Sequence, residues 1–266
     1  MPSIKTLARS LLRGPNGRLK DGEFQTPDWD SYRMDIHRPF EVLEPPARET
    51  RIVDHALAAL ASRGILAGTT YDTARYDAMR DAVRTGFEIP WTAITPRMQR
   101  LIYAINAIRR PQVMIAAGVF CGDTFISNAG AAVGPGAVYT ARALVGLEIS
   151  PAEAARAEAN VRRVDPTGTA RVLAEDAVGF CRDWQGTIDL LYLDADGDGG
   201  RGKAIYSEIL AAAWDKLPEG ALILAHNSVN SVREMRDYLA FVRDARNCRA
   251  SVNVVLDPEG LEVTVR

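Results

Sequence analysis

A glycine turn that follows an apolar run is the feature of this 266-residue chain with the clearest chemical meaning. The run begins at Val113, breaks at Gly118-Val-Phe-Cys-Gly122, and is followed by a helical pattern. Glycine lets the backbone approach a ligand closely, and the free N–H groups at the start of a helix attract negative charge. Glu148 ends the next apolar run, where a carboxylate can accept both hydroxyls of a ribose. The turn and Glu148 together indicate a nucleotide-type cofactor site.

Candidate polar residues stand just past the ends of five predicted strands. A covered strand has no reason to end in carboxylates unless that rim is wet or occupied by a ligand. Because parallel strands present their carboxyl ends at one edge of a sheet, we expect these groups to form one site. In chain order they are Gly118 to Thr124, Glu148, Glu175 with Asp176, Asp194 with Asp196, and His226 with Asn227.

The elements that position these groups alternate between strands and helices after Arg110. This alternation predicts a mostly parallel sheet covered by helices on both faces. Strands are predicted at 112–118, up to Glu148, and at 170–174, 188–194, 220–226, 249–255 and 260–265. Helices are predicted at 122–132, 151–163, 177–183, 203–216 and 231–243. The last two strands are joined by Asp257-Pro-Glu-Gly260, which predicts a hairpin and one antiparallel strand at the edge of the sheet.

The N-terminal part of the chain carries weaker signals. Residues 1 to about 50 are rich in Pro, Gly and Arg without sustained periodicity, which predicts an arm or lid rather than core structure. Apolar spacing predicts helices over 49–67 and 73–83. Thr95-Pro96 gives a third helix its N-cap and its first residue.

Composition excludes several classes of protein. The 32 Lys and Arg residues and 34 Asp and Glu residues give a net charge of −2, so we expect no nucleic-acid partner. No apolar run approaches the ~20 residues that cross a bilayer, and the opening segment does not resemble a secretory signal, so we expect a cytoplasmic protein without a membrane partner. Cys121, Cys181 and Cys248 lack metal-site spacing and are expected to be buried. The expected partner is a small-molecule substrate, and the arm would favour a homodimer.

The ordered set of motifs resembles the class I S-adenosylmethionine (SAM)-dependent methyltransferases, and within them the catechol and caffeoyl-CoA type O-methyltransferases. The resemblance implies an α/β fold with a Rossmann-like, seven-stranded, mostly parallel sheet whose last strand is antiparallel. The resemblance covers residues 94–266, the predicted methyltransferase domain, and residues 1–93 are predicted to form an N-terminal arm and helical lid. The motifs are Ile94-Thr-Pro, Gly118-Val-Phe-Cys-Gly122-Asp-Thr124, Glu148, Asp176-Ala177, Leu193-Asp-Ala-Asp196, Pro218-Glu-Gly220, His226-Asn227 and Gly260-Leu-Glu-Val.

The same resemblance implies that the cofactor is SAM. Glu148 would accept both ribose hydroxyls, Asp176 with Ala177 would receive the adenine, and Thr124 would reach the methionine carboxylate. Asp194 would lie under the reacting centre. The full set of implied cofactor residues is Gly118, Phe120, Gly122, Asp123, Thr124, Glu148, Asp176, Ala177 and Asp194.

Three positions depart from the family pattern. Ala116 stands where an acidic residue usually lies, so the contact to the methionine amino group is either missing or supplied by Asp123. His226 replaces the Asp of an Asp-Asn pair, and Gly197 stands where metal-dependent members carry a Lys. Because Mg²⁺ prefers oxygen ligands, we expect metal-independent chemistry and no metal site. A softer metal held by Asp194, His226 and Asn227 is the less favoured case.

The expected function is methyl transfer to an oxygen or nitrogen nucleophile of a small molecule. His226 is the candidate general base, with Asn227, Asp194 and Asp196 as further catalytic candidates. A structural link at the strand end is the alternative role for His226. A SAM-using cyclase that releases methylthioadenosine and a cofactor-binding protein without turnover are alternative functions. A nicotinamide dehydrogenase fits less well, because the turn lacks the full Gly-x-Gly-x-x-Gly spacing.

Two further features lie near the predicted site. Tyr71, Phe87 and Trp91 are either aromatic residues that close the pocket or plain packing residues. The glycines at 197, 199, 200 and 202 predict either a flexible loop over the site or a solvated turn.

Overall fold

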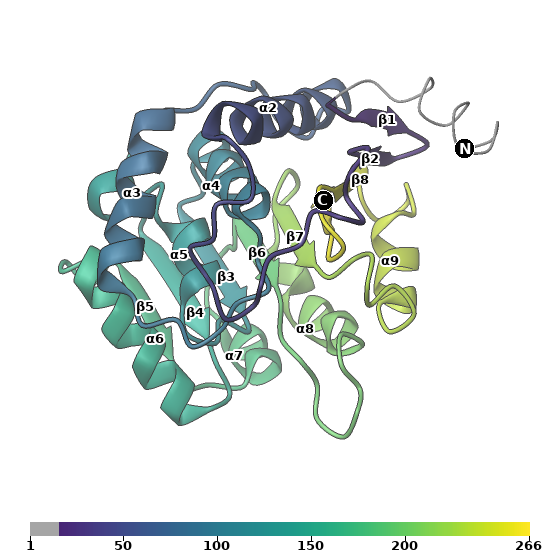
Figure 1. The fold of residues 1–266 in the computed structure, drawn as a ribbon. Coiled ribbons are helices and arrows are strands. Elements are labelled where there is room, and N and C mark those ends of the chain that lie inside the picture. The colour runs from purple at the N-terminus through teal and green to yellow at the C-terminus, as the bar shows by residue number, and fades with distance from the viewer. Residues whose placement is uncertain (1–15) are drawn as a thin grey trace.

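The computed structural model describes residues 16–266, and its centre is a nine-stranded sheet with helices on both faces (Figure 1). The part of the predicted arm before residue 16 lies outside the described residues. The spatial order of the strands is β1-β2-β8-β9-β7-β6-β3-β4-β5. Their bounds are β1 Arg18–Lys20, β2 Glu23–Gln25, β3 Val113–Ala117, β4 Ala143–Leu147, β5 Ala170–Leu173, β6 Leu190–Leu193, β7 Leu222–His226, β8 Ala250–Val255 and β9 Leu261–Val265.

The five strands from β3 to β7 are parallel and carry the candidate residues at their carboxyl ends. Every residue of β3 is buried, which suits a strand whose two faces are both covered. β3 lies between β4 and β6, so the chain turns to opposite sides of β3 as it leaves for its neighbours. Such a switch point leaves a crevice at the carboxyl ends of the strands, where ligands bind in open α/β sheets. The predicted α/β, Rossmann-like fold is confirmed.

Two features of the sheet differ from the prediction. The last strand, β9, is antiparallel as predicted, but it lies between β7 and β8 instead of at the edge. All five of its residues are buried, Glu262 and Thr264 included, as is typical of a strand inside a sheet. The sheet also has nine strands instead of seven, because β2 of the arm pairs in parallel with β8 and β1 pairs with β2. This hairpin covers the hydrogen-bonding edge that β8 would otherwise expose.

The helices form two layers, each with its own apolar cluster against the sheet. One layer holds α2 Pro46–Ser62, α3 Thr73–Gly86, α4 Pro96–Arg109, α5 Asp123–Ala129 and α6 Pro151–Val164. The other holds α7 Ala177–Asp183, α8 Ile205–Ala213 and α9 Arg236–Val242. Short 3-10 turns occur at η1 Gly134–Gly136 and η2 Trp214–Lys216. No helix among the described residues is both long enough and apolar enough to cross a membrane.

The predicted start of α4 is confirmed. The Thr95 side chain accepts a hydrogen bond from the Met98 nitrogen, and Pro96 is the first helical residue. By contrast, α9 begins at Arg236, five residues later than predicted, because residues 231–235 form turns.

Arg97 on α4 holds the N-terminal arm at two points. Its guanidinium donates to Glu44 over 2.6 and 2.7 Å and to Asp28 over 3.0 Å. It also lies 3.6 Å from the centre of the Tyr32 ring. The arm between these anchors passes beside the turn before α4, where the Thr92 nitrogen donates to the Ile36 carbonyl. The domain boundary at residue 93 stays a prediction, and the contacts of Arg97 cross it.

Candidate active site

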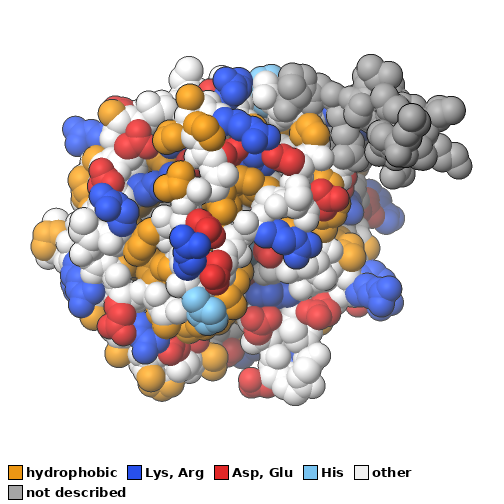
Figure 2. Space-filling model, viewed as in Figure 1, with side chains coloured by type: hydrophobic (Ala, Val, Ile, Leu, Met, Phe, Trp, Pro, Cys, Tyr) orange, Lys and Arg blue, Asp and Glu red, His pale blue; other side chains and the backbone are white. Residues whose placement is uncertain are grey.

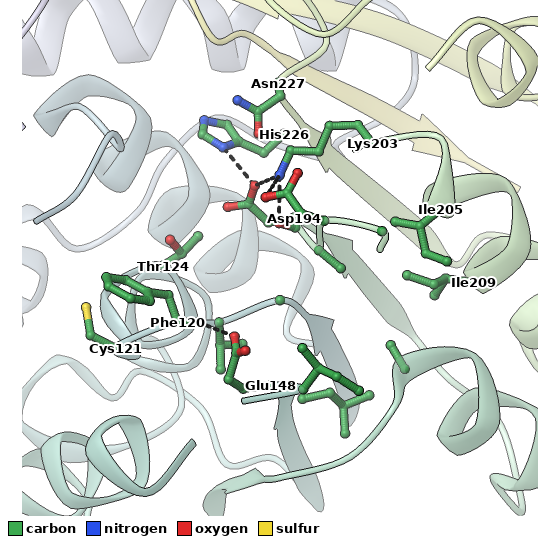
Figure 3. A pocket seen from close by; sticks show the side chains of 18 of the residues that line it. Phe120, Cys121, Thr124, Glu148, Asp194, Lys203, Ile205, Ile209, His226 and Asn227 are labelled. Atoms are coloured by element: carbon green, nitrogen blue, oxygen red, sulfur yellow. Dashed lines mark hydrogen bonds and ion pairs between the residues drawn. The ribbon is translucent and has the colours of Figure 1, made fainter. Parts of the chain in front are cut away.

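A cavity of about 450 Å³ lies at the carboxyl ends of the parallel strands (Figure 3). Its volume is within the range of roughly 300–1,000 Å³ that small-molecule sites occupy. The groups predicted after five strands therefore meet in one place. Those that line the cavity are Gly118, Phe120, Asp123, Thr124, Glu148, Glu175, Asp176, Ala177, Asp194, Asp196, His226 and Asn227.

Glu148 connects the end of β4 to the glycine turn after β3. Its Oε2 accepts from the Phe120 nitrogen over 2.9 Å (Figure 3). Its Oε1 accepts from the Ser150 nitrogen over 3.0 Å. Phe120 has a φ of +46°, a conformation that costs a bulky residue about 1–3 kcal/mol and that the hydrogen bond to Glu148 helps to hold. Each carboxylate oxygen retains acceptor capacity, so Glu148 can still receive two hydroxyl donors.

The two glycines of the turn are explained by close packing of the main chain. A Cβ at Gly118, which has a φ of +79°, would lie 2.4 Å from the Cα of Ala195. A Cβ at Gly122 would lie 3.3 Å from Ala157 of α6. Gly118 lines the cavity, whereas Gly122 is not among the lining residues. The predicted contact of Gly122 with a cofactor therefore has no support in this geometry.

Asp123 is a buried carboxylate beside the turn. It accepts a hydrogen bond from Gln99 Nε2, 3.1 Å from its Oδ2. Burial raises the pKa of Asp123 to about 6, against the opposing effect of hydrogen bonds from Thr92 and Gln99. A carboxyl group that loses its proton near neutrality is well suited to pair with a cationic ligand group.

Asp176 lines the cavity and caps α7. Its Oδ2 accepts from the Gly179 nitrogen over 2.7 Å, and its side chain lies on the surface. The second carboxylate oxygen makes no contact within the cap and can accept a donor from a ligand. Ala177, the first residue of α7, lines the cavity next to it.

Lys203 is a buried cation that sequence analysis missed. Its Nζ lies 2.8 Å from the main-chain oxygen of Asp194, 3.1 Å from Asp194 Oδ1 and 3.4 Å from Asp196 Oδ2. His226 Nδ1 lies 3.3 Å from the same Asp194 Oδ1, so one carboxylate oxygen faces two donors (Figure 3). Gly197 stands where the family pattern has a lysine, but the fold brings Lys203 to this cluster from six residues farther along the chain.

The loop between Asp196 and Lys203 folds back on itself. The Gly197 nitrogen donates to the Gly202 carbonyl over 2.9 Å, and the Lys203 nitrogen donates to Glu234 Oε2 over 2.7 Å. These bonds close a small glycine hairpin that returns Lys203 to the end of β6. The glycine run followed directly by a lysine is the sequence signal that would have indicated this arrangement.

The charges around Asp194 shift the pKa values of both acid and base. Burial alone would raise the pKa of Asp194, but Lys203 and His226 lower it below its ordinary value. Burial would lower the pKa of His226, but the attraction of Asp194, the hydrogen bond to it and the charge of Asp257 raise it. His226 Nε2 is buried and has no hydrogen-bond partner within residues 16–266. The imidazole is therefore oriented through Nδ1 and has a free second nitrogen.

Of the three aromatic residues predicted near the site, one lines the cavity. Trp91 lines the cavity and packs against Phe120, with 4.6 Å between ring centroids. Tyr71 and Phe87 are packing residues outside the cavity lining, so only Trp91 of these three is placed to close the pocket.

Cys121 is a lining residue, but burial raises the pKa of its thiol to about 12. All three cysteines are buried and free, as predicted.

The donors around Asp194 do not fit a divalent metal. No group of three or more His, Cys, Asp and Glu side chains within the described part of the chain is arranged to hold one. The Lys203 ammonium already occupies the side of Asp194 that faces Asp196, and a second cation there would be repelled. We therefore assign no chemical step to a metal.

Part of the chain matches a known protein family. Residues 115–228 match a family model described as a methyltransferase domain. This part of the chain is therefore similar to a methyltransferase domain. The matched segment begins in β3 and ends just past Asn227, so it includes Glu148, Asp194 and His226. The resemblance to class I methyltransferases is confirmed.

Solved structures share the fold of this domain. Cofactor-bound Rv0187 from MTB has a TM-score of 0.56 and 18% identity, covering 73% of this chain and 90% of its own. The Bacillus cereus O-methyltransferase in complex with SAH has a TM-score of 0.53 and 15% identity, covering 80% and 97%. The O-methyltransferase TomG from Streptomyces achromogenes, in complex with SAM, has a TM-score of 0.53 and 18% identity, covering 74% and 90%. Among curated proteins, no sequence matches significantly.

Proposed function

We propose that this domain binds SAM and transfers its methyl group to an oxygen nucleophile of a small molecule. The observation that carries the proposal is the carboxylate of Glu148, which two main-chain N–H groups orient at the switch point of the sheet within the matched methyltransferase region. Oxygen as the nucleophile is supported by the names of the solved O-methyltransferases with this fold.

The residues of the cavity suit the three parts of SAM. Glu148 would hold the ribose hydroxyls, and the free oxygen of Asp176 would receive the adenine amino group. At the methionine end, Thr124 would hold the carboxylate of SAM. Asp123 would pair with the ammonium of SAM, because Ala116 stands where the family usually has an acidic residue. When bound, SAM supplies a methyl group on a sulfonium, so the oxygen–carbon bond forms as the carbon–sulfur bond breaks and the electron pair stays on sulfur.

His226 is the proposed general base. An imidazole that donates Nδ1–H to a carboxylate presents Nε2 as a proton acceptor, and the carboxylate stabilises the imidazolium that forms. Asp194 is placed for this role at 3.3 Å from Nδ1. The acceptor hydroxyl would give its proton to Nε2, while Asn227 and Asp196 would contact the acceptor at the rim. Most of the remaining rate enhancement would come from holding the acceptor in line for transfer.

The charge of the chain agrees with a small-molecule acceptor. The net charge is −2, and Figure 2 shows acidic and basic side chains interspersed on one face of the molecule. A nucleic-acid substrate would be expected to need a basic excess.

Product analysis tests the proposal. Purified protein is incubated with SAM and a broad panel of hydroxy and amino compounds, and the nucleoside products are separated by chromatography. We expect S-adenosylhomocysteine (SAH) to form, and to form only when an acceptor is present. Methylthioadenosine formed without an acceptor would support the cyclase instead. Bound SAM with no product across the whole panel would support a binding protein.

A further inference from the structure

The Lys203 ammonium is held from two directions but retains one weakly used donor. An ammonium has three N–H donors and no acceptor. Two donors face Asp194, at 2.8 Å from its main-chain oxygen and 3.1 Å from Oδ1. The third faces Asp196 over 3.4 Å, and 73% of that side chain is exposed. Exposed ion pairs are weak, so an oxygen atom entering the cavity can take the place of Asp196.

The position of the ammonium is fixed by the main chain. The main-chain nitrogen of Lys203 donates to Glu234 Oε2 over 2.7 Å. The hydrogen bond from the Gly197 nitrogen to the Gly202 carbonyl closes the loop just before Lys203. The side chain is buried, and its Nζ lies 5.8 Å from the centre of the Tyr206 ring. A charged donor that is already oriented and shielded from water stabilises a negative charge more than a mobile surface lysine does.

Asp194 Oδ1 is saturated by its two donors. Lys203 Nζ and His226 Nδ1 both approach this oxygen, and a carboxylate oxygen offers two lone pairs. A divalent metal bound to this oxygen would have to displace one of the two donors. The ammonium of Lys203 therefore supplies positive charge beside Asp194 without a metal.

We infer that Lys203 is the built-in cation of the active site, which holds the acceptor oxygen as an oxyanion where a metal-dependent enzyme would place a divalent metal. The inference rests on the proposed function and names its substrate class, a small molecule with an acidic hydroxyl such as a phenol or an enol. As His226 takes the proton, Lys203 balances the negative charge left on the acceptor oxygen. The acceptor then stays anionic and hydrogen-bonded until the methyl group is transferred.

Ionisation of a bound phenol tests the charge of the site without requiring the natural acceptor. 4-Nitrophenol is added to the protein–SAH complex, and its ionisation is followed by absorbance across pH. In the wild type we expect the pKa of the bound phenol to fall by about one unit or more, because a nearby cation favours the phenolate. Lys203→Met should abolish this fall, whereas Lys20→Met on β1, outside the cavity, should retain it. An unshifted pKa in the wild type, a shift retained in Lys203→Met, or failure of 4-nitrophenol to bind the SAH complex would each overturn the inference.

Metal dependence is the second readout. Mn²⁺ is titrated into the wild type and followed by electron paramagnetic resonance, and the affinity for 4-nitrophenol in the SAH complex is measured with and without EDTA. We expect no stoichiometric Mn²⁺ and no effect of EDTA. One bound Mn²⁺ per chain, or loss of phenol binding in EDTA, would contradict the role of Lys203.

SAH affinity separates failure of this inference from failure of the proposed function. Lys203→Met is expected to bind SAH as the wild type does, which also shows that the variant is folded. If the wild type itself binds no SAH, the proposed function fails. If SAH binds both proteins and the phenol behaves alike in both, only the role of Lys203 is wrong.

Discussion

The main-chain nitrogen of Phe120 donates to Glu148 Oε2 over 2.9 Å, and this bond joins the turn after β3 to the end of β4. It fixes the carboxylate at the centre of the crevice between two parallel strands and supports the left-handed conformation of Phe120. The residue proposed to hold the ribose is therefore also the residue that shapes the turn.

Replacing Glu148 tests its role in cofactor binding. In Glu148→Gln the side-chain NH₂ replaces one carboxylate oxygen, so a donor faces the main-chain N–H of either Phe120 or Ser150. The negative charge that attracts the ribose hydroxyls is also lost. We expect the Kd for SAH to rise about 10–100-fold, the equivalent of ~1.5–3 kcal/mol for a hydrogen bond to a charged group. Calorimetry measures the change, and the exposed Glu219→Gln is the control. Equal affinities for the two variants would remove Glu148 from the site.

Asp123 is predicted to recognise the amino group at the methionine end. Asp123→Asn should weaken SAH about 10–100-fold, because a charge-assisted bond is lost. Its affinity for 5′-methylthioadenosine, which lacks the amino group, should not change. Because the carboxyl group has a pKa of about 6 and must be ionised to attract an ammonium, wild-type SAH affinity should fall as the pH drops through about 6. Equal weakening of both ligands would instead indicate a packing role.

The pH dependence of turnover tests His226. A general base is inactive while protonated, so kcat should be low in acid and rise with pH. Because the pKa of His226 is raised, the midpoint should lie above the ordinary 6.5. His226→Gln should lower kcat about 10²–10⁴-fold and flatten this rise, without changing SAH affinity. A variant that keeps the wild-type rate and profile would show that His226 is only a structural link.

Arg97 is predicted to be a large contributor to stability. It is buried with Glu44, and removal of one partner leaves an uncompensated charge. Arg97→Ala should lower the free energy of unfolding by ~3–5 kcal/mol. The control is Arg236→Ala, whose side chain is 80% exposed and should change stability by about 0.5 kcal/mol or less. Denaturant midpoints compare the two, and similar values would mean that the arm is not anchored through Arg97.

The parallel half of the fold was predictable because its signals are local. A continuous apolar run such as β3, ended by glycines, identifies a doubly covered strand without reference to the rest of the chain. The same reasoning fails for β1 and β2, since three-residue strands are too short to show periodicity. It also fails for β9, because the choice between the edge and the interior depends on which distant strand it pairs with.

The site was predictable to the extent that it follows strand ends. Glu148, Asp194 and His226 each stand at the end of a buried run, so the topology alone brings them together. Lys203 does not follow a strand directly, and its contact with Asp194 depends on a hairpin that reverses the chain over nine residues. Such a contact depends on loop conformation, which residue spacing does not reveal.

Calorimetric titration with SAH shows whether the crevice that holds Glu148 binds the adenosyl cofactor. We expect saturable binding of one SAH per chain in the wild type and markedly weaker binding in Glu148→Gln. Absence of binding to the wild type at millimolar SAH would contradict it.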